Sequence, residues 1–327
     1  MYRRLPWLTA LALTACGEND KLLNVLAPPP PPADVACAGA DASTPWMSIT
    51  APVQQGLGGV WGAAANDVWA VGGLGTILHY DGTAWTDASL PSALPDLVAV
   101  RGIGSDDVWA VGKGGVALHY NGAAWSMVQT GVSADFSAVW PITQSEVWFG
   151  GADGVRRFDG TTLSRPAGAP TDAVHGIWAA GPSDVWMIRD VAFAHYDGQR
   201  FTTVPIAEAG LLSGLWGIDA GHVFAVGHSQ SHVPGFAELD SGGWNFKAAP
   251  PRAVFFALFS RDAERIWLGA ADTSIYLRDR GSWCREHLET TGAINGFFAA
   301  EGGAIWAVGA KVGPGGKSIP VLLRRVP

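Results

Sequence analysis

Apolar and aromatic residues recur along this chain in a fixed pattern with a period near 40 residues. The first repeat column holds a large side chain in each of seven copies, namely Trp61, Arg101, Trp140, Trp178, Trp216, Phe259 and Phe298. The second column lies eight residues later in every copy and holds Trp69, Trp109, Trp148, Trp186, Phe224, Trp267 and Trp306. A third column holds Trp46, Trp85, Trp125, Leu163, Phe201, Trp244 and Trp283. Fifteen of the 16 tryptophans fall in these columns, so the pattern is an internal repeat.

Each copy contains four short β-branched and aromatic segments separated by Gly, Asn, Asp or Ser, which is typical of strands rather than helices. In the first copy these segments are residues 60–61, 68–71, 77–80 and 85–88. Four strands in about 40 residues correspond to one blade of a β-propeller. The residue two positions before the first column is always Gly or Ala, as expected where innermost strands crowd around an axis. We expect the side chains of the first and second columns to fill the gaps between blades.

The number of strands predicts how the ring closes. The seventh copy runs out at residues 321–325 without a fourth strand, whereas a spare fourth strand surrounds Trp46 at the front of the chain. The sequence therefore predicts an all-β, seven-bladed propeller with four-stranded blades, in which the N-terminal strand joins the last blade. Such closure removes the exposed edges of an open sheet.

Hairpin residues lie between the third and fourth strands, four positions before the third column. An acidic or Asn residue stands there in six copies, and in four copies, including Asp81-Gly82, a glycine follows it. Asp-Gly and Asn-Gly pairs favour tight turns. A ring of functional carboxylates is the alternative interpretation.

The repeat resembles those of secreted bacterial propeller proteins. Asp81-Gly82 followed by Trp85 is similar to a degenerate Asp-box (BNR) hairpin, although Ala84 stands where the fuller motif has Thr. The likeness to kelch and WD40 blades is more distant. The resemblance implies a propeller lipoprotein but carries no defined activity, because one fold serves many functions.

Residues 1–15 have the features of a signal peptide, with Arg3 and Arg4 before a short apolar run. The run ends in Leu-Thr-Ala followed by Cys16, which resembles the lipobox of bacterial lipoproteins. That resemblance implies lipidation of Cys16 and, because Gly17 follows, placement at the outer membrane on its periplasmic or cell-surface side. The alternative is an ordinary cleaved signal with an incidental cysteine; both interpretations place the chain outside the cytoplasm.

Residues 16–44 form a proline-rich tether, in which the run at residues 28–32 is a stiff, extended spacer. Cys37 in this tether and Cys284 in blade six are the remaining cysteines. In an oxidising compartment they form a disulfide or stay as two buried thiols, and both alternatives are open.

Residues 45–327 are expected to form the propeller domain. The full chain has a net charge of −8, and removal of the two signal-peptide arginines gives (21 − 2) − 29 = −10. This acidic balance, with no basic run, argues against a nucleic-acid partner. The histidines fall on separate blades or on one loop, so we expect no metal site and no cofactor, and we expect a monomer.

Charged residues of blades two to four are predicted to gather on the face that carries the strand two–three loops and the connections between blades. They are Asp96, Arg101, Lys113, Asp135, Asp153, Asp172, Arg189 and Asp190. We expect this patch to bind a protein or glycan of the cell envelope, so that the chain is a membrane-anchored binding or scaffold module and not an enzyme. The alternatives are a glycoside hydrolase or lyase using paired carboxylates, a structural envelope component, and simple capping of strands by solvated loops.

Overall fold

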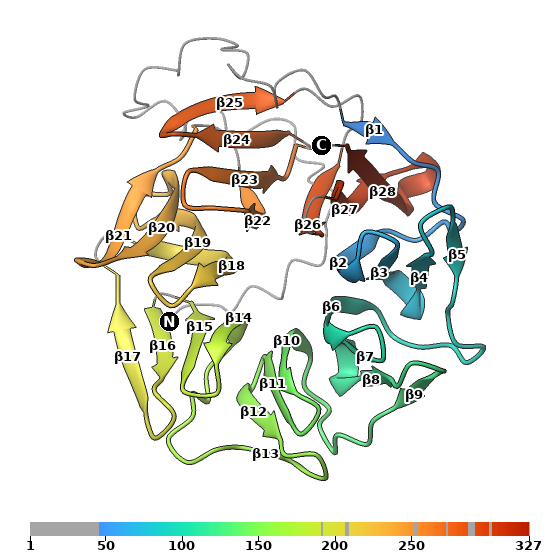
Figure 1. Cartoon of the computed structure of the whole chain (residues 1–327), viewed down its shortest axis with the longest axis horizontal. Helices are drawn as coiled ribbons and strands as arrows, with labels where there is room; N and C mark the ends of the chain where they lie inside the picture. The colour runs from blue at the N-terminus through green and yellow to red at the C-terminus, as the bar shows by residue number, and fades with distance from the viewer. Residues whose placement is uncertain are drawn as a thin grey trace.

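The computed structural model describes residues 46–190, 192–206, 209–250, 254–272, 274–286, 292–300 and 303–326. The predicted signal peptide and tether, with Cys16 and Cys37, lie outside these residues, so their boundaries stay predictions. Within the described chain, seven antiparallel four-stranded sheets are arranged in a ring about a central axis (Figure 1); we call the region enclosed by their innermost strands the channel. The predicted seven-bladed propeller is confirmed.

We number the blades 1 to 7 in chain order. The innermost strands are β2 (Leu57–Ala64), β6 (Leu97–Gly104), β10 (Phe136–Thr143), β14 (Val174–Gly181), β18 (Ala209–Asp219), β22 (Phe255–Ser260) and β26 (Ala293–Ala299). The second strands are β3 (Asp67–Gly72), β7 (Asp107–Gly112), β11 (Glu146–Gly151), β15 (Asp184–Arg189), β19 (His222–Ser229), β23 (Arg265–Ala270) and β27 (Ile305–Val312).

The third strands are β4 (Ile77–Tyr80), β8 (Ala117–Tyr120), β12 (Gly154–Phe158), β16 (Ala192–Tyr196), β20 (Pro234–Asp240), β24 (Ile275–Asp279) and β28 (Ser318–Arg325). The outermost strands are β5 (Trp85–Asp87), β9 (Trp125–Met127), β13 (Leu163–Ser164), β17 (Phe201–Pro205), β21 (Gly243–Ala248), β25 (Ser282–Glu286) and β1 (Met47–Ser48). Single-turn 3-10 helices η3 (Gly73–Gly75), η4 (Lys113–Gly115) and η5 (Pro314–Gly316) lie between second and third strands.

Ring closure follows the predicted pairing. Strand β1 lies antiparallel to β28, with Met47 opposite Arg324, and β26 contacts both β22 and β2. The indole Nε1 of Trp46 also donates a hydrogen bond to Glu286 at the end of β25. The start and the end of the described chain are therefore held in blade 7, next to blade 6.

The core consists of seven clusters of buried side chains among the described residues, one at each junction between neighbouring blades. In the cluster between blades 1 and 2, Trp69 and Val71 pack with Leu97 and Val100 of the next innermost strand. The same arrangement places Trp306 of blade 7 against blade 1. Trp69 is only 3 % exposed, which confirms that the second column fills the gaps between blades.

The column of small residues marks the closest approach of neighbouring innermost strands. A Cβ atom added to Gly59 would lie 3.1 Å from the carbonyl oxygen of Val98 and 3.2 Å from Cα of Ala99, the equivalent residue of blade 2. A longer side chain would push the two strands apart, because neither backbone can yield. The predicted crowding is confirmed.

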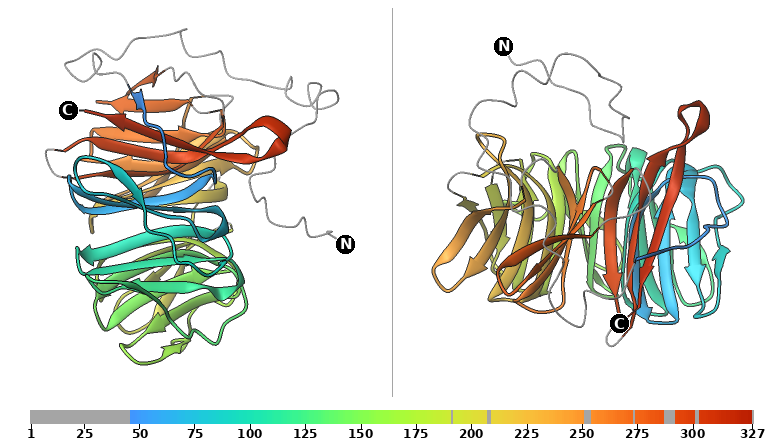
Figure 2. Two further views of the ribbon diagram at one scale, coloured as in Figure 1. Left: turned by 90° about the vertical axis from the view of Figure 1, so that its right-hand side faces the viewer. Right: turned by 90° about the horizontal axis from the view of Figure 1, so that it is seen from above.

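The two ends of the channel differ. Because the strands of a blade alternate in direction, one face of the ring carries the second-to-third-strand loops and the connections between blades; we call it the loop face. The opposite face carries the first-to-second-strand and third-to-fourth-strand turns; we call it the turn face. The hairpin β27–β28 is longer than its equivalents and extends beyond the ring (Figure 2).

Candidate functional site: the central channel

Asp96 and Asp135, the two acids predicted to form a paired site on the loop face, each hold the loop of the preceding blade. Asp96 Oδ1 accepts a hydrogen bond from Leu74 N of η3 at 3.0 Å, and its Oδ2 accepts one from Lys113 Nζ at 2.9 Å. Asp135 Oδ1 accepts one from Gly114 N of η4 at 2.8 Å. The two carboxylates therefore repeat one structural role at successive blade junctions.

The environment of Asp96 agrees with this role. Burial alone would raise the pKa of its carboxyl, but the hydrogen bonds from Leu74 N and Lys113 outweigh burial and hold the pKa below its ordinary value. Asp96 is therefore an anion at neutral pH, fixed by groups of two blades.

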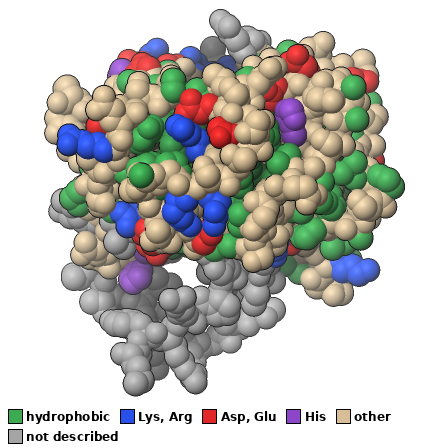
Figure 3. Space-filling view, turned by 90° about the horizontal axis from the view of Figure 1, so that it is seen from below, with side chains coloured by type: hydrophobic (Ala, Val, Ile, Leu, Met, Phe, Trp, Pro, Cys, Tyr) green, Lys and Arg blue, Asp and Glu red, His purple; other side chains and the backbone are tan. Residues whose placement is uncertain are grey.

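The remaining predicted loop-face residues form local ion pairs. Asp153 lies 2.6 Å from the Arg156 guanidinium, Arg189 lies 2.7 Å from Asp172, and Asp190 lies 2.6 Å from His175. Figure 3 shows one side of the ring, where acidic and basic side chains alternate without a field of one sign. The structure thus divides the predicted patch into separate pairs; whether they bind a ligand stays a prediction.

Arg101 lies apart from these loop-face pairs. It is the fifth residue of β6, which begins on the loop face beside Asp96 and ends at the turn face. Its strand partner is Trp109, two residues beyond the start of β7. The side chain therefore lies in the turn-face half of the channel, where the sequence pattern could not place it.

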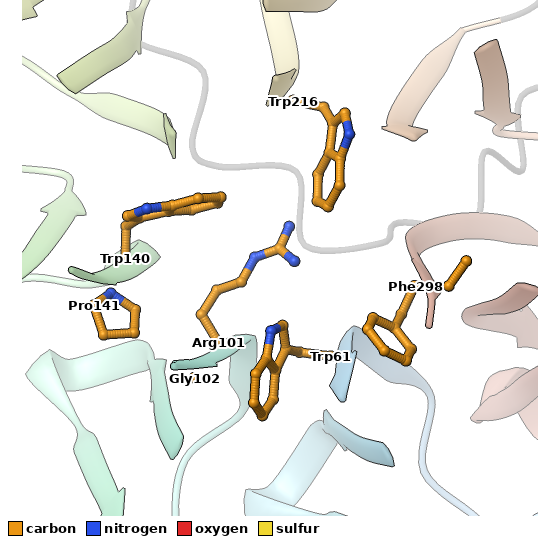
Figure 4. A pocket seen from close by; sticks show the side chains of 8 residues that line it. Trp61, Arg101, Gly102, Trp140, Pro141, Trp216 and Phe298 are labelled. Carbon is orange, nitrogen blue, oxygen red and sulfur yellow. The ribbon is translucent and has the colours of Figure 1, made fainter. Parts of the chain in front are cut away.

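A cavity of about 140 Å³ surrounds Arg101 in this half of the channel (Figure 4). The guanidinium carbon lies 5.1 Å from the ring centre of Trp140 and 5.0 Å from that of Trp216. At these distances the cation is attracted by the π-faces. The cavity is lined by Trp61, Arg101, Gly102, Trp140, Pro141, Trp216, Phe298 and Ala299.

The first column packs at the junctions between blades, as predicted, and part of it also lines the channel. Trp61, Trp140 and Trp216 are half-buried and line the channel, whereas Trp178 and Phe259 are buried. The side chains still reach the next blade, because Trp61 covers Gly102 and Trp178 covers Gly217. Glycine follows the first column at these positions because the neighbouring indole occupies the space of its Cβ.

Arg101 has no hydrogen-bond or ion-pair partner within the described residues; its contacts there are with the two indole rings. Desolvation by burial lowers the pKa of its guanidinium from 12.5 to about 10. It therefore remains a cation at neutral pH, with up to five N–H donors available. An enclosed cation with free donors and aromatic walls can bind an anion of matching geometry.

The histidines of the third strands serve the blades themselves. His79 lies 2.7 Å from Asp67 Oδ1 and stacks on Trp69 at 4.1 Å between ring centres. Two further blades repeat the triad, as His119 with Asp107 and Trp109 and as His195 with Asp184 and Trp186. Across the described ranges no three His, Cys, Asp or Glu side chains are placed to hold a metal ion.

The hairpin aspartates also act locally, as the turn interpretation predicts. Asp81 Oδ1 accepts hydrogen bonds from Thr83 N, Thr83 Oγ1 and Ala84 N, and Gly82 has φ +96°. The hydrogen bonds from Thr83 and Ala84 lower the pKa of Asp81 to about 2. The alternative of a functional carboxylate ring loses its basis, because these oxygens satisfy turn amides.

Cys284 lies buried in β25, with its sulfur 3.4 Å from the carbonyl oxygen of Leu277. Its predicted partner Cys37 is outside the described residues, so the pairing stays a prediction. None of the described helices is long and apolar enough to cross a membrane.

Comparison with known proteins defines the class to which this fold and channel belong. The structure is similar to YCF48 bound to D1 peptide, at 15% identity and a TM-score of 0.67 over 86% of this chain and 97% of that chain. It is also similar to the WD40 propeller domain of Doa1, at 13% identity and a TM-score of 0.68 over 86% and 97% of the two chains.

A third similar structure is the extracellular domain of the putative hybrid two component system BT4673 from B. thetaiotaomicron. It is 13% identical, with a TM-score of 0.66 over 85% of this chain and 39% of that one. No family model matches this sequence, and no curated protein does. The chain is thus a seven-bladed propeller resembling the BNR-type YCF48 and WD40 propellers, and at these identities the likeness shows the fold alone.

Proposed function

We propose that this chain is an exported, membrane-anchored β-propeller that binds a protein or glycan of the cell envelope. The observation that carries the proposal is the channel cavity, in which the cationic Arg101 lies between Trp140 and Trp216 and has no acidic partner among the residues that the structure describes. An unpaired guanidinium costs folding free energy. A binding partner that supplies an anion would offset this cost by pairing with the guanidinium.

The similar structures support a binding role by analogy. YCF48 was solved with a D1 peptide bound, and the BT4673 propeller belongs to an extracellular domain. A ring of blades around a channel suits such a role, because residues of several blades meet at a common centre, here those of blades 1, 2, 3, 5 and 7. We extend only the general role, binding outside the cytoplasm, to this chain.

A binding role also agrees better with the acidic residues than glycoside cleavage does. Glycosidases need two carboxyl groups facing each other across the substrate, about 5–9.5 Å apart. Asp96 and Asp135 each accept a backbone amide from a different blade, so we assign them to blade packing. We therefore propose a binding module in place of a hydrolase or lyase.

Anchoring rests on Cys16 and the apolar run before it. We propose lipidation at Cys16 and residence at the outer membrane, with the tether of residues 16–44 holding the ring off the surface. Palmitate labelling of the full chain in a Gram-negative host tests this step. We expect label in the native chain and none in Cys16→Ser; equal labelling of both would refute the anchor.

The channel's role is tested by site-specific photo-crosslinking of the full chain in cells. A photoreactive residue replaces Ile103, two residues after Arg101 and 45 % exposed, or Leu74 on the loop face, 70 % exposed. We expect adducts with an envelope protein or glycan from position 103 and not from position 74. Adducts from position 74 alone would move the binding site to the loop face, and none from either would refute the proposed function.

A further inference from the structure

The channel cavity also indicates the chemistry of its ligand; this inference rests on the function proposed above. We propose that it binds a carboxylate carried by a polypeptide, from an acidic side chain or a chain end, with Arg101 as the residue that recognises it. The class of polypeptides with an accessible carboxylate beside aliphatic residues would then be the partner class. The charge of the cavity, its size and the apolar residues in and near it each support this assignment.

The charge argument begins with the neighbours of Arg101. Arg156 and Arg189 in blades 3 and 4 are paired with Asp153 and Asp172, at 2.6 and 2.7 Å. Arg101 instead faces two indole rings, and no acid of the described chain reaches it. Its planar guanidinium is suited to two parallel hydrogen bonds with one carboxylate.

The net charge of the chain is opposite in sign to the charge of Arg101. The chain carries a net charge of −8, so its long-range field repels acidic ligands instead of collecting them. Recognition of a carboxylate therefore depends on the local geometry of the cavity. Binding should be specific to that group and lost when the guanidinium is removed.

The size of the cavity favours one small group. Its volume is about 140 Å³, whereas pockets that hold a whole small molecule have roughly 300–1,000 Å³. A single acidic side chain or the last residue of a chain matches the smaller volume. An acidic sugar within an oligosaccharide is larger than this volume, so most of the oligosaccharide would lie outside the cavity.

The apolar residues in and near the cavity favour a polypeptide over a glycan. Pro141, Phe298 and Ala299 belong to the cavity lining, and Ile103 and Ile218, near the turn-face ends of β6 and β18, are 45 % and 39 % exposed. Such side chains offer apolar contact area and no hydrogen bonds. Leucine or valine next to a carboxylate can bury area there, whereas sugar hydroxyls would lose water without compensation.

The test uses fluorescence anisotropy with the purified full chain and three labelled leucine- and alanine-rich pentapeptides. The first is amidated with one internal glutamate, the second has glutamine there, and the third has that glutamine with a free C-terminal carboxylate. A tri-uronate oligosaccharide is the fourth probe. The variants are Arg101→Met, which keeps an apolar stem, Arg101→Lys, and the charge-matched control Lys317→Met at an exposed position between β27 and β28.

We expect the glutamate peptide, the free-carboxylate peptide or both to bind, and the amidated glutamine peptide to bind at least tenfold more weakly. Arg101→Met should weaken binding by about 10–100-fold, the range for losing a hydrogen-bonded charged partner. Arg101→Lys should retain part of the affinity, and Lys317→Met should bind like the native chain. Which carboxylate-bearing peptide binds identifies the source of the group.

Three results would overturn the inference. Equal binding by Arg101→Met in a variant with a native circular-dichroism spectrum would remove Arg101 from recognition. Binding of the tri-uronate alone would exchange the polypeptide for an acidic glycan. Binding of none of the probes, together with adducts at position 103, would reject the carboxylate while leaving the proposed binding role intact.

Discussion

Replacing Arg101 by methionine should make the propeller more stable while weakening binding in the channel. Burial lowers the guanidinium pKa from 12.5 to about 10, which corresponds to a penalty of about 3 kcal/mol at 1.36 kcal/mol per pKa unit. The side chain keeps some contact with the open cavity, which reduces the penalty, and attraction to Trp140 and Trp216 offsets about 1 kcal/mol more. We expect a net gain of about 1–2 kcal/mol.

The pH dependence of this gain follows from the sign of the shift. The folded protein holds the proton of Arg101 less tightly than the unfolded chain does, so the penalty is complete wherever both states are protonated. The gain should therefore be constant from pH 6 to pH 9. It should shrink only as the pH rises through about 10 towards 12.5.

Thermal and urea unfolding followed by circular dichroism measure this effect. A gain of about 1–2 kcal/mol raises the Tm of a domain of this size by roughly 2–4 °C. Lys317→Met, at an exposed position between β27 and β28, should change stability by less than about 0.5 kcal/mol. A lower Tm for Arg101→Met would refute the reasoning, because it would mean that the channel stabilises the cation without a ligand.

Three further predictions concern the scaffold. Gly217→Ala should destabilise the protein by about 1–3 kcal/mol in urea unfolding, because its Cβ would lie 2.3 Å from a neighbouring indole; Gly181→Ala, with open space, is the control, and equal effects would disprove the packing argument. Stability should fall as the pH drops from about 4 towards 2, because the hydrogen-bonded carboxylate of Asp81 takes up its proton there. Asp81→Asn should reduce this loss of stability in acid. An unchanged dependence of stability on pH in the variant would contradict the prediction. Non-reducing peptide mapping of the exported chain should recover Cys37 linked to Cys284, and recovery of two alkylated thiols would exclude the bridge.

The repeat made most of the fold predictable from the sequence. The constant offset of eight residues between Trp61 and Trp69 fixes two adjacent strands opposite each other, as the observed pairing shows. The missing last strand and the spare segment around Trp46 predicted closure through β1. These features depend on local periodicity and strand counting, which a single sequence contains.

The site was less predictable because it depends on how blades meet. Asp96 and Arg101 are five residues apart and both charged, yet one caps η3 of blade 1 and the other enters the channel. Asp96 lies in the connection before β6, whereas Arg101 is the fifth residue of that strand. The glycines after the first column, such as Gly102, were an available signal, since a glycine following a large aromatic column marks the place where the neighbouring ring lies.

The closure through β1 has a consequence for assembly. Residue 47 pairs with residue 324, so blade 7 can form only when nearly the whole chain has been delivered. If the N-terminus crosses the membrane first, β1 emerges before any blade exists and stays an unpaired edge until β28 follows. β1 and β28 are far apart in sequence, so their pairing carries a loop-closure entropy cost and slows folding. The pairing of β1 with β28 is therefore the last step of folding. Until it occurs, a chaperone or the unpaired edge of another copy can bind the open edge of blade 7, and a protease can cleave there.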